Sequence, residues 1–308
     1  MIVVFSGGTG GAKLIEGLAA EIDPAEITII CNTGDDSTFH GLYVSPDIDT
    51  VTYTLAGLTD TDKGWGIKHD TFNALDQLGR LGGDTWFRLG DKDLATHITR
   101  TRLLGEGFRL SQATDRIRRA LGIKATILPM ADERVETRVQ TPQGEISFQE
   151  FFVKERWSSE VTAIRFARVE SSRPAPGVLE AIERAAAIIV GPSNPITSIG
   201  PILAVPGIRS ALTASSAPKV GVSPIIGASA ISGPAHKLMK ACGREASAIG
   251  VAEGYEDFLD TLLIAAEDKN MIEPIAKSQI HAVATDIRMT SSSDKRRLAR
   301  QVLALSGK

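Results

Sequence analysis

The stretch Ile2-Val-Val-Phe-Ser-Gly-Gly-Thr-Gly-Gly-Ala-Lys13 decides the fold of this chain. Its apolar start predicts a short buried strand, its glycines predict a tight turn, and residues 13–20 have the periodicity of a helix. A second apolar run, residues 27–31, predicts the next strand. A strand, a helix and another strand in this order are typical of a parallel sheet.

The same alternation continues along the chain. Short apolar runs predict further buried strands at residues 126–128, 188–190, 220–222, 248–251, 262–265 and 282–284. Helical periodicity predicts helices near residues 48–57, 69–80, 93–104, 111–121, 178–185, 255–260 and 294–305. Together these elements predict an α/β protein with a Rossmann-like parallel sheet at its core.

Two regions interrupt this alternation. Residues 59–122 contain no clear strand pattern, so we predict a mostly helical insertion there. Residues 133–170 alternate between apolar and polar types, and the Thr-Pro-Gln-Gly turn at 141–144 predicts a hairpin at the edge of the main sheet. No internal repeat and no linker marks a domain boundary, so we expect residues 1–308 to form a single domain.

The overall composition is that of an ordinary globular protein. Hydrophobic residues make up 43% and charged residues 23% of the 308, which excludes disordered and fibrous classes. A formal net charge of -3 and an aromatic content of 5% give no reason to expect nucleic-acid binding. The chain has two distant cysteines, Cys31 and Cys242, and no apolar run of ~18 residues, so we expect a cytoplasmic protein without a membrane span.

The glycine loop Ser6-Gly-Gly-Thr-Gly-Gly-Ala-Lys13 predicts an anion site. Backbone N–H groups at the start of a helix attract phosphate, and glycines let a ligand approach closely. The loop is not a Walker loop, because Ala12 and Leu14 flank the lysine, and it lacks the third glycine of the dinucleotide motif. A strand-to-helix turn without a ligand is the alternative.

Two further segments bring four aspartates to the end of the second predicted strand, where open α/β sheets bind ligands. These segments are Asn32-Thr-Gly-Asp-Asp36 and Ser45-Pro-Asp-Ile-Asp-Thr50. Mg²⁺ is commonly held by one or two carboxylates together with substrate phosphates, so we predict Asp49 as a metal ligand, with Asp36 as a weaker partner. Capping of the following helix by these side chains is the alternative.

A rigid polar loop follows the strand predicted at residues 188–190. It reads Gly191-Pro-Ser-Asn-Pro-Ile-Thr-Ser198, and its hydroxyl and amide side chains suit the recognition of a base or a ribose. A rigid turn without a ligand is again the alternative.

These segments, taken in order, resemble the 2-phospho-L-lactate transferase family of coenzyme F-420 biosynthesis (CofD/FbiA type). The resemblance includes residues 6–13, residues 45–50 and the loop from Gly191, which it extends to Pro201, and it covers residues 6 to about 260. Its other motifs are Gly64-Trp-Gly66 with Asp70-Thr71, Leu89-Gly-Asp-Lys-Asp-Leu-Ala-Thr-His97, Ile127-Leu-Pro-Met130 and Val222-Ser-Pro-Ile-Ile-Gly227. It implies a Rossmann-like fold with a helical insertion.

The resemblance also implies a reaction. A 2-phospho-L-lactate or phosphoenolpyruvate group moves from a guanosine diphosphate conjugate to the terminal ribityl hydroxyl of the deazaflavin Fo, which releases GMP, forms F-420-0 and requires Mg²⁺. These small molecules are the expected partners, and the apolar stretches after residue 199 favour a homodimer. The rival interpretation is a non-enzymatic, sugar-nucleotide-binding regulator of the gluconeogenesis factor type, because that family shares the glycine loop and the core.

Residue roles follow from the resemblance for the binding of Fo by Asp49 and Arg88, and from residue chemistry for the others. Asp49 and Arg88 are expected to bind Fo, and Asp49 is also the expected catalytic residue. The aromatic face of Trp65 is expected to cover the deazaflavin ring, with a structural tryptophan as the alternative. The expected nucleotide-binding residues are Gly7, Gly8, Thr9, Gly10, Lys13, Ser193, Asn194, Thr197 and Ser198.

Overall fold

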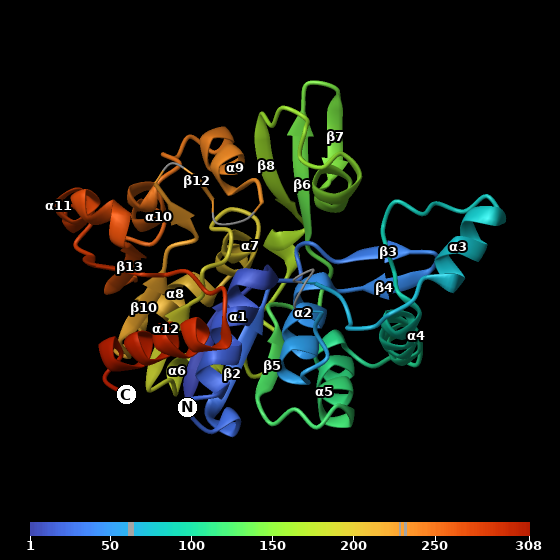
Figure 1. The fold of residues 1–308 in the computed structure, drawn as a ribbon, viewed down its shortest axis with the longest axis horizontal. Coiled ribbons are helices and arrows are strands. Elements are labelled where there is room, and N and C mark those ends of the chain that lie inside the picture. Colours follow the sequence, from blue (N-terminus) through green and yellow to red (C-terminus); the bar gives the residue numbers. More distant parts are fainter. Residues whose placement is uncertain (61–64, 228, 231–232) are drawn as a thin grey trace.

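The computed structural model describes residues 1–60, 65–227, 229–230 and 233–308. A seven-stranded parallel sheet with the strand order β14-β13-β10-β9-β1-β2-β5 forms its centre (Figure 1). Its strands are β1 (Ile2–Ser6), β2 (Ile27–Cys31), β5 (Thr126–Pro129), β9 (Ala187–Val190), β10 (Lys219–Val222), β13 (Thr261–Ala265) and β14 (His281–Thr285). The strand order reverses between β1 and β9, the point at which such sheets bind ligands. The predicted α/β class with a parallel sheet is confirmed.

Successive residues of each central strand face opposite sides of the sheet, which therefore has two hydrophobic cores. Ile2 and Val4 face α1 (Gly8–Ala19), α2 (Pro46–Leu55) and α12 (Ser292–Leu305), whereas Val3 and Phe5 face the other side. The helices on that other side are α6 (Val178–Glu183), α7 (Ile199–Ala204), α8 (Ile208–Ala214), α9 (Ala235–Ala241), α10 (Ala248–Glu253) and α11 (Ile272–Ala276). No helix in the described part of the chain is long and apolar enough to cross a membrane.

Two of the predicted elements are wrong. Residues 248–251 form the start of α10 instead of a strand, and residues 255–260 form turns instead of a helix. Ser247 explains the first difference, because its hydroxyl accepts hydrogen bonds from the N–H groups of Ile249 and Gly250 and so caps the helix. A run of four apolar residues is too short to distinguish the two-residue period of a strand from the 3.6-residue period of a helix. The cap at Ser247 therefore determines that this segment is helical.

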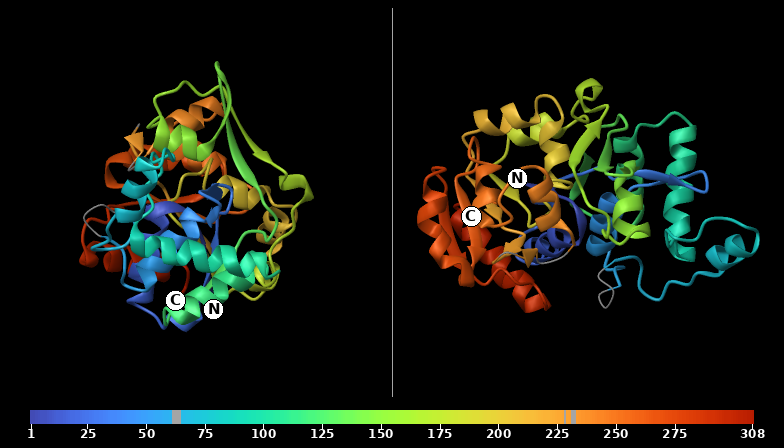
Figure 2. Two further views of the ribbon diagram at one scale, coloured as in Figure 1. Left: turned by 90° about the vertical axis from the view of Figure 1, so that its right-hand side faces the viewer. Right: turned by 90° about the horizontal axis from the view of Figure 1, so that it is seen from above.

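The region predicted as a helical insertion contains α3 (Asn73–Arg80), α4 (Asp91–Gly105) and α5 (Leu110–Ala120), while residues 61–64, Gly64 among them, lie outside the described residues. Helices α3 and α4 extend away from the sheet (Figure 2), whereas α5 packs against β5. A hairpin that the sequence did not predict, β3 (Ser37–Phe39) and β4 (Leu42–Val44), lies beside α4.

Two aspartates cap α3 and α4 reciprocally. The carboxylate of Asp70, which precedes α3, accepts hydrogen bonds from the N–H groups of Lys92 and Asp93 at the start of α4, at 2.7 and 3.1 Å. Asp91, the first residue of α4, accepts from the N–H groups of Asn73 and Ala74 at the start of α3, at 3.0 and 2.9 Å. Each helix therefore has its first turn closed by the segment that leads into the other.

The hairpin predicted in residues 133–170 forms, but not at the edge of the main sheet. Strands β6 (Glu136–Thr141) and β7 (Gly144–Ser147) pair with each other, and β6 pairs with β8 (Ala163–Ala167), in a separate antiparallel sheet. The edge strand of the main sheet on this side is β5. The small sheet still reaches the centre of the molecule, because the N–H of Thr137 in β6 donates to the carbonyl oxygen of Gly34 at 2.6 Å.

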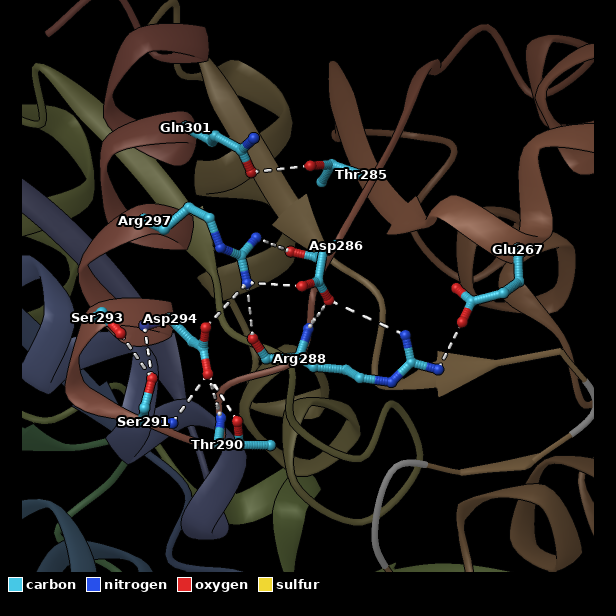
Figure 3. Close-up of polar contacts among 10 residues, drawn as sticks. All are labelled: Glu267, Thr285, Asp286, Arg288, Thr290, Ser291, Ser293, Asp294, Arg297 and Gln301. Carbon is cyan, nitrogen blue, oxygen red and sulfur yellow. Dashed lines mark hydrogen bonds and ion pairs between the residues drawn. The ribbon is translucent and has the colours of Figure 1, made fainter.

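A polar network fixes the start of α12 after β14 (Figure 3). Arg297 donates to the Asp286 carboxylate at 3.0 Å and to the Arg288 carbonyl at 3.1 Å. Asp294 accepts from the Thr290 hydroxyl at 2.6 Å and from other groups of the turn that leads into the helix. We call this group of residues, 286–297, the C-terminal network; its charged side chains are partly or fully exposed. A second short hairpin, β11 (Ile225–Ile226) and β12 (Ser229–Ala230), follows β10.

Candidate active site at the carboxyl edge of the sheet

The glycine loop between β1 and α1 is held by two other segments of the chain. The N–H of Gly7 donates to Ser193 Oγ at 3.1 Å, and the N–H of Gly8 donates to Asp47 Oδ1 at 2.6 Å. Two of the predicted phosphate donors therefore already have acceptors within the protein. Thr9 and Gly10 follow in the first turn of α1, where N–H groups have no partner within the helix.

The glycines of this loop allow close packing against the 191–198 loop. A Cβ atom at Gly10 would lie 2.3 Å from the carbonyl oxygen of Pro192, and one at Gly11 would lie 2.8 Å from Ser193 Oγ. Residues larger than glycine would therefore separate the two loops. The structure thus brings together the two segments predicted to bind the nucleotide.

Lys13 is partly exposed and forms no ion pair with the described residues.

The side chains of the 191–198 loop have different tasks. Ser193 supports Gly7, and Asn194 Oδ1 accepts hydrogen bonds from Ile196 N and Thr197 N, at 2.9 and 3.3 Å, within its own turn. The hydroxyl of Thr197 is buried without a hydrogen-bond partner among the described residues, and Ser198 is also buried. Of the four predicted residues, Asn194 has a clear structural task, whereas Thr197 retains an unused hydroxyl.

Four buried aspartates lie beside this loop, and each has different partners. Asp47 accepts from Asn32 Nδ2 at 2.8 Å as well as from the glycine loop. Asp36 accepts from the hydroxyls of Tyr43 and Ser45, at 2.9 and 2.7 Å. In contrast, Asp35 Oδ1 is buried and has no hydrogen-bond partner among the described residues. The fourth aspartate, Asp49, is bound by an arginine.

Burial raises the pKa of three of these carboxyl groups. It raises the pKa of Asp47 to about 6, although the hydrogen bonds from Asn32 and Gly8 act in the opposite direction. Burial, and next the charge of Asp47, raise the pKa of Asp35. Burial also raises the pKa of Asp36, and its two hydroxyl donors offset this only in part. The buried carboxylates outnumber the one buried arginine beside them, Arg100, so a cation would stabilise their charged forms.

Asp49 lies in the first turn of α2 and is bound by Arg100 of α4. Arg100 Nη1 donates to Asp49 Oδ2 at 3.1 Å, and Nη2 donates to Oδ1. His97 Nδ1 lies 3.7 Å from the same Oδ2 atom. The sequence offered a signal for this arrangement, since Asp93, His97 and Arg100 are spaced to share one face of a helix. The sequence alone does not show that this face meets Asp49.

The residues predicted to contact the acceptor lie in the insertion. The guanidinium of Arg88 is exposed and sits 4.2 Å from the centre of the Phe72 ring. Trp65 is 44% exposed and lies just before the bridge between Thr59 and Ile67. The structure therefore does not bury Trp65 in the core of the insertion, and it leaves Arg88 able to contact a ligand through its N–H groups.

An aromatic group that the sequence analysis missed lies close to Arg88 along the chain. Phe39 and Phe87 stack with ring centres 3.9 Å apart, and Trp86 meets Phe39 edge to face at 5.3 Å. These rings line a cavity of about 360 Å³, and Arg134 and Glu150 also line it. The signal was present in the sequence as the adjacent pair Trp86-Phe87, but nothing in it pointed to Phe39.

The described residues of this region offer oxygen atoms suited to a magnesium ion, but they do not form a complete set of ligands. No three His, Cys, Asp or Glu side chains among the described residues are arranged around a common point. Mg²⁺, however, needs only one or two carboxylates when a substrate phosphate and water complete its shell. The buried and unpartnered Asp35 Oδ1 is an oxygen of this kind, and Asp36 lies next to it in the chain. The residues present therefore fit a Mg²⁺ ion whose ligands come partly from the protein and partly from the substrate.

Comparisons with known proteins agree over the whole chain. A family model described as "2-phospho-L-lactate transferase CofD" matches residues 2–303. A 2-phospho-L-lactate transferase of Methanosarcina mazei is 41% identical over 302 residues, which are 98% of this chain and 99% of that protein. A phosphoenolpyruvate transferase of Streptomyces griseus is 44% identical over 311 residues, which are 99% and 98% of the two chains.

A solved structure has the same fold at much lower identity. It is a member of the UPF0052 family from Bacillus halodurans, 17% identical to this chain, with a TM-score of 0.63 and coverage of 98% of both chains. At this identity the likeness concerns the fold alone.

Proposed function

The chain belongs to the 2-phospho-L-lactate transferase family, and from this premise we propose that it acts in coenzyme F-420 biosynthesis. In the proposed reaction, a 2-phospho-L-lactate or phosphoenolpyruvate group moves from a guanosine diphosphate conjugate to the deazaflavin Fo. The products are GMP and F-420-0, or its phosphoenolpyruvate counterpart. The two named types of relative, which are similarly close to this chain, support both donor acids.

The observation that carries this proposal is the meeting of an anion site and an acidic site at one place. The Asp47 carboxylate of α2 contacts Gly8 at the start of α1, beside the point where the strand order reverses. Helix starts attract phosphate, whereas buried carboxylates attract a cation. A diphosphate donor that binds together with Mg²⁺ uses both properties.

The proposed nucleotide site uses the part of the glycine loop that has no partner in the protein. Thr9 and Gly10 supply N–H groups, and Lys13 supplies a positive charge. Gly7 and Gly8 hold the loop against Ser193 and Asp47 instead of contacting the phosphate directly. The guanosine is proposed to contact the 191–198 loop, in which the Thr197 hydroxyl is unused.

Magnesium is proposed as the cation, with Asp49 and Asp36 as its protein ligands and Asp35 as a third carboxylate close by. When bound, the ion would neutralise charge on the diphosphate oxygens. The Asp36 carboxylate is oriented by Tyr43 and Ser45, and the Asp49 carboxylate by Arg100, so neither side chain is free to turn away from the site.

The protein's own residues mainly position the two substrates. The terminal hydroxyl oxygen of Fo forms a new bond to the phosphorus that carries the three-carbon acid. The bond from that phosphorus to GMP breaks, GMP leaves with the electron pair, and the hydroxyl proton passes to water. Asp49 is proposed to accept a hydrogen bond from the attacking hydroxyl, while Arg88 and Trp65 bind the deazaflavin.

One assay decides the proposal. The protein is incubated with Fo, Mg²⁺ and a guanosine diphosphate conjugate of either acid, and GMP release is measured by chromatography. We expect GMP and Fo that carries the phospholactyl or phosphoenolpyruvyl group in equal amounts. Absence of GMP with both donors, together with unchanged Fo fluorescence on addition of protein, would contradict the proposal. Binding of a sugar nucleotide without turnover would instead favour the regulator named above.

A further inference from the structure

Arg100 binds Asp49 from the neighbouring helix. The Arg100 side chain is only 1% exposed, which places it among the largest fully buried side chains of the described residues. It donates hydrogen bonds to both carboxylate oxygens of Asp49. A guanidinium that contacts both oxygens fixes the plane of a carboxylate as well as its position.

Other residues of α2 and α4 hold this pair in place. His97 Nδ1 lies 3.4 Å from Arg100 Nη1, and His97 Nε2 lies 3.1 Å from Asp93 Oδ2. The hydroxyl of Tyr53 in α2 donates to Asp93 Oδ1 at 2.5 Å. The two helices are therefore joined at two levels, by Asp49 with Arg100 and by Tyr53 with Asp93, and His97 lies between them.

Stability alone does not account for the buried pair. Charged groups lose their hydration when they are buried, and apolar side chains of similar volume often stabilise a core equally well or better. Moreover, each carboxylate oxygen has a second lone pair, so Asp49 can accept a further contact while Arg100 holds it. The pair therefore leaves Asp49 fixed in orientation and still able to contact a ligand.

We propose that Arg100 is a positioning residue of the transfer reaction, which holds the Asp49 carboxylate in the orientation that the acceptor hydroxyl requires. The inference rests on the proposed function, in which Asp49 contacts the acceptor. Arg100 acts through Asp49 and does not itself contact a substrate. Through this pair, α4 connects the helical insertion to the carboxyl edge of the sheet.

Replacement of Arg100 by lysine separates the effect of charge from that of geometry. Lysine keeps a positive charge near Asp49 but cannot form the planar, two-point contact. We expect kcat of R100K to fall roughly 100-fold, because a small misplacement of a catalytic group is costly, while the Kd of Fo rises less than about tenfold. Fo fluorescence gives the Kd independently of turnover, and thermal melting shows whether each variant is folded.

Arg102 supplies the matched control. It lies on the same helix, and its exposed side chain pairs with Glu106 at 2.5 Å. R102K is expected to keep the kcat of the wild type. In R100A, added guanidinium ion is expected to restore part of the lost turnover, whereas a purely structural role predicts no such rescue in protein that is already folded.

The outcomes distinguish this inference from the proposed function. A wild type that releases GMP and an R100K variant with the same kcat would overturn the inference alone. Equal losses of kcat in R100K and R102K would overturn it as well. A wild type that releases no GMP with either donor would overturn the proposed function and, with it, the role of Arg100.

Discussion

The molecule contains arginine–aspartate pairs in two very different places. In the active-site region, Arg100 and Asp49 are almost completely buried, with side chains 1% and 7% exposed. In the C-terminal network, Arg297 and Asp286 are 33% and 52% exposed. The residue types are the same, so the difference lies in access to water. Water weakens an exposed pair and also replaces a lost partner, whereas a buried charge that loses its partner has no substitute.

The carboxyl groups of the two regions respond to their surroundings in opposite ways. Burial raises the pKa of Asp35, Asp36 and Asp47 at the site. Hydrogen bonds from Thr290 and Ser291 lower the pKa of Asp294 in the C-terminal network. The site therefore holds its negative charges at a cost to folding, and the network gains stability from its charges. A cost of this kind agrees with the functional role proposed for the buried aspartates.

The largest expected effect comes from removing the charge of a buried partner. Asp49→Asn removes the charged carboxylate that binds the buried Arg100, and the free energy of unfolding should fall by about 3–5 kcal/mol. Asp286→Asn in the C-terminal network should lower it by at most about 1 kcal/mol. Urea unfolding of both variants measures the difference. Equal effects would mean that burial does not separate the two regions.

The same Asp49→Asn variant also tests the catalytic assignment. At a temperature where it remains folded, GMP release should largely disappear, while binding of a guanine nucleotide should remain close to that of the wild type. Turnover that survives at the level of the wild type would contradict the role proposed for Asp49.

The acid response gives the second expected effect. The pKa of Asp47 is about 6 in the folded protein against 3.8 as the ordinary value, so the folded state binds the extra proton between these limits. Stability should therefore fall as the pH rises from about 4 to 6, by about 1–3 kcal/mol. Asp47→Asn should reduce this slope in urea unfolding measured with EDTA, and the raised pKa values of Asp35 and Asp36 should account for the part that remains.

Asp294 serves as a control, because its pKa in the folded protein is lowered whereas that of Asp47 is raised. Its pKa is lowered, so its contribution is present above the ordinary value of 3.8 and is lost as the pH falls below it. Asp294→Asn should therefore reduce the loss of stability in strong acid and leave the slope between pH 4 and 6 unchanged. A slope in that range that depends on Asp294 instead of Asp47 would reverse the comparison.

A third, smaller effect concerns an exposed aromatic group. Trp65→Ala should raise the Kd of Fo about tenfold, since the loss of one stacked ring costs about 1.4 kcal/mol. Trp157, similarly exposed at 41% but placed in the segment after β7, is the control, and its replacement by alanine should leave the Kd unchanged. If Trp86→Ala weakens Fo binding and Trp65→Ala does not, the deazaflavin ring binds in the cavity lined by Trp86 and Phe87 instead.

The smallest expected effect concerns an exposed ion pair of α12. Arg300 pairs with Glu21 at 2.8 Å, and the Arg300 side chain is mostly exposed. Arg300→Met should change the melting temperature only slightly, because Glu21 keeps Arg296 as a partner, and salt should reduce the difference because it screens exposed charges. A melting experiment at low and high salt measures this. A larger effect that salt does not change would show that this pair resembles the buried one.

The sequence allowed most of the sheet to be predicted and little of the site's internal contacts. Long apolar runs such as residues 27–31 identify buried strands directly, because two covered faces require apolar side chains throughout. The strand predicted at 248–251 is wrong, because four residues are too few to show a periodicity. The hydroxyl of Ser247 caps a helix there instead. The β3–β4 hairpin was missed because its strands contain only three residues each.

The aspartates themselves could be placed at the end of the second strand, but not their partners. The contact between Asp49 and Arg100 joins residues 51 positions apart, and the contact between Gly7 and Ser193 joins residues 186 apart. Such contacts depend on the packing of whole elements, which local patterns do not encode. For the same reason, the sequence could not show that Gly7 and Gly8 donate to the protein itself.

The reciprocal caps of α3 and α4 have a consequence for hydrogen exchange. Because Asp91 closes the start of α3 and Asp70 closes the start of α4, separation of the two segments frees the first turns of both helices at once. The amide protons of Ala74 and Lys92 should therefore exchange with solvent in one opening event, at a common rate. Helix α4 also contains Arg100, so this same opening would break the hydrogen bonds between Arg100 and Asp49.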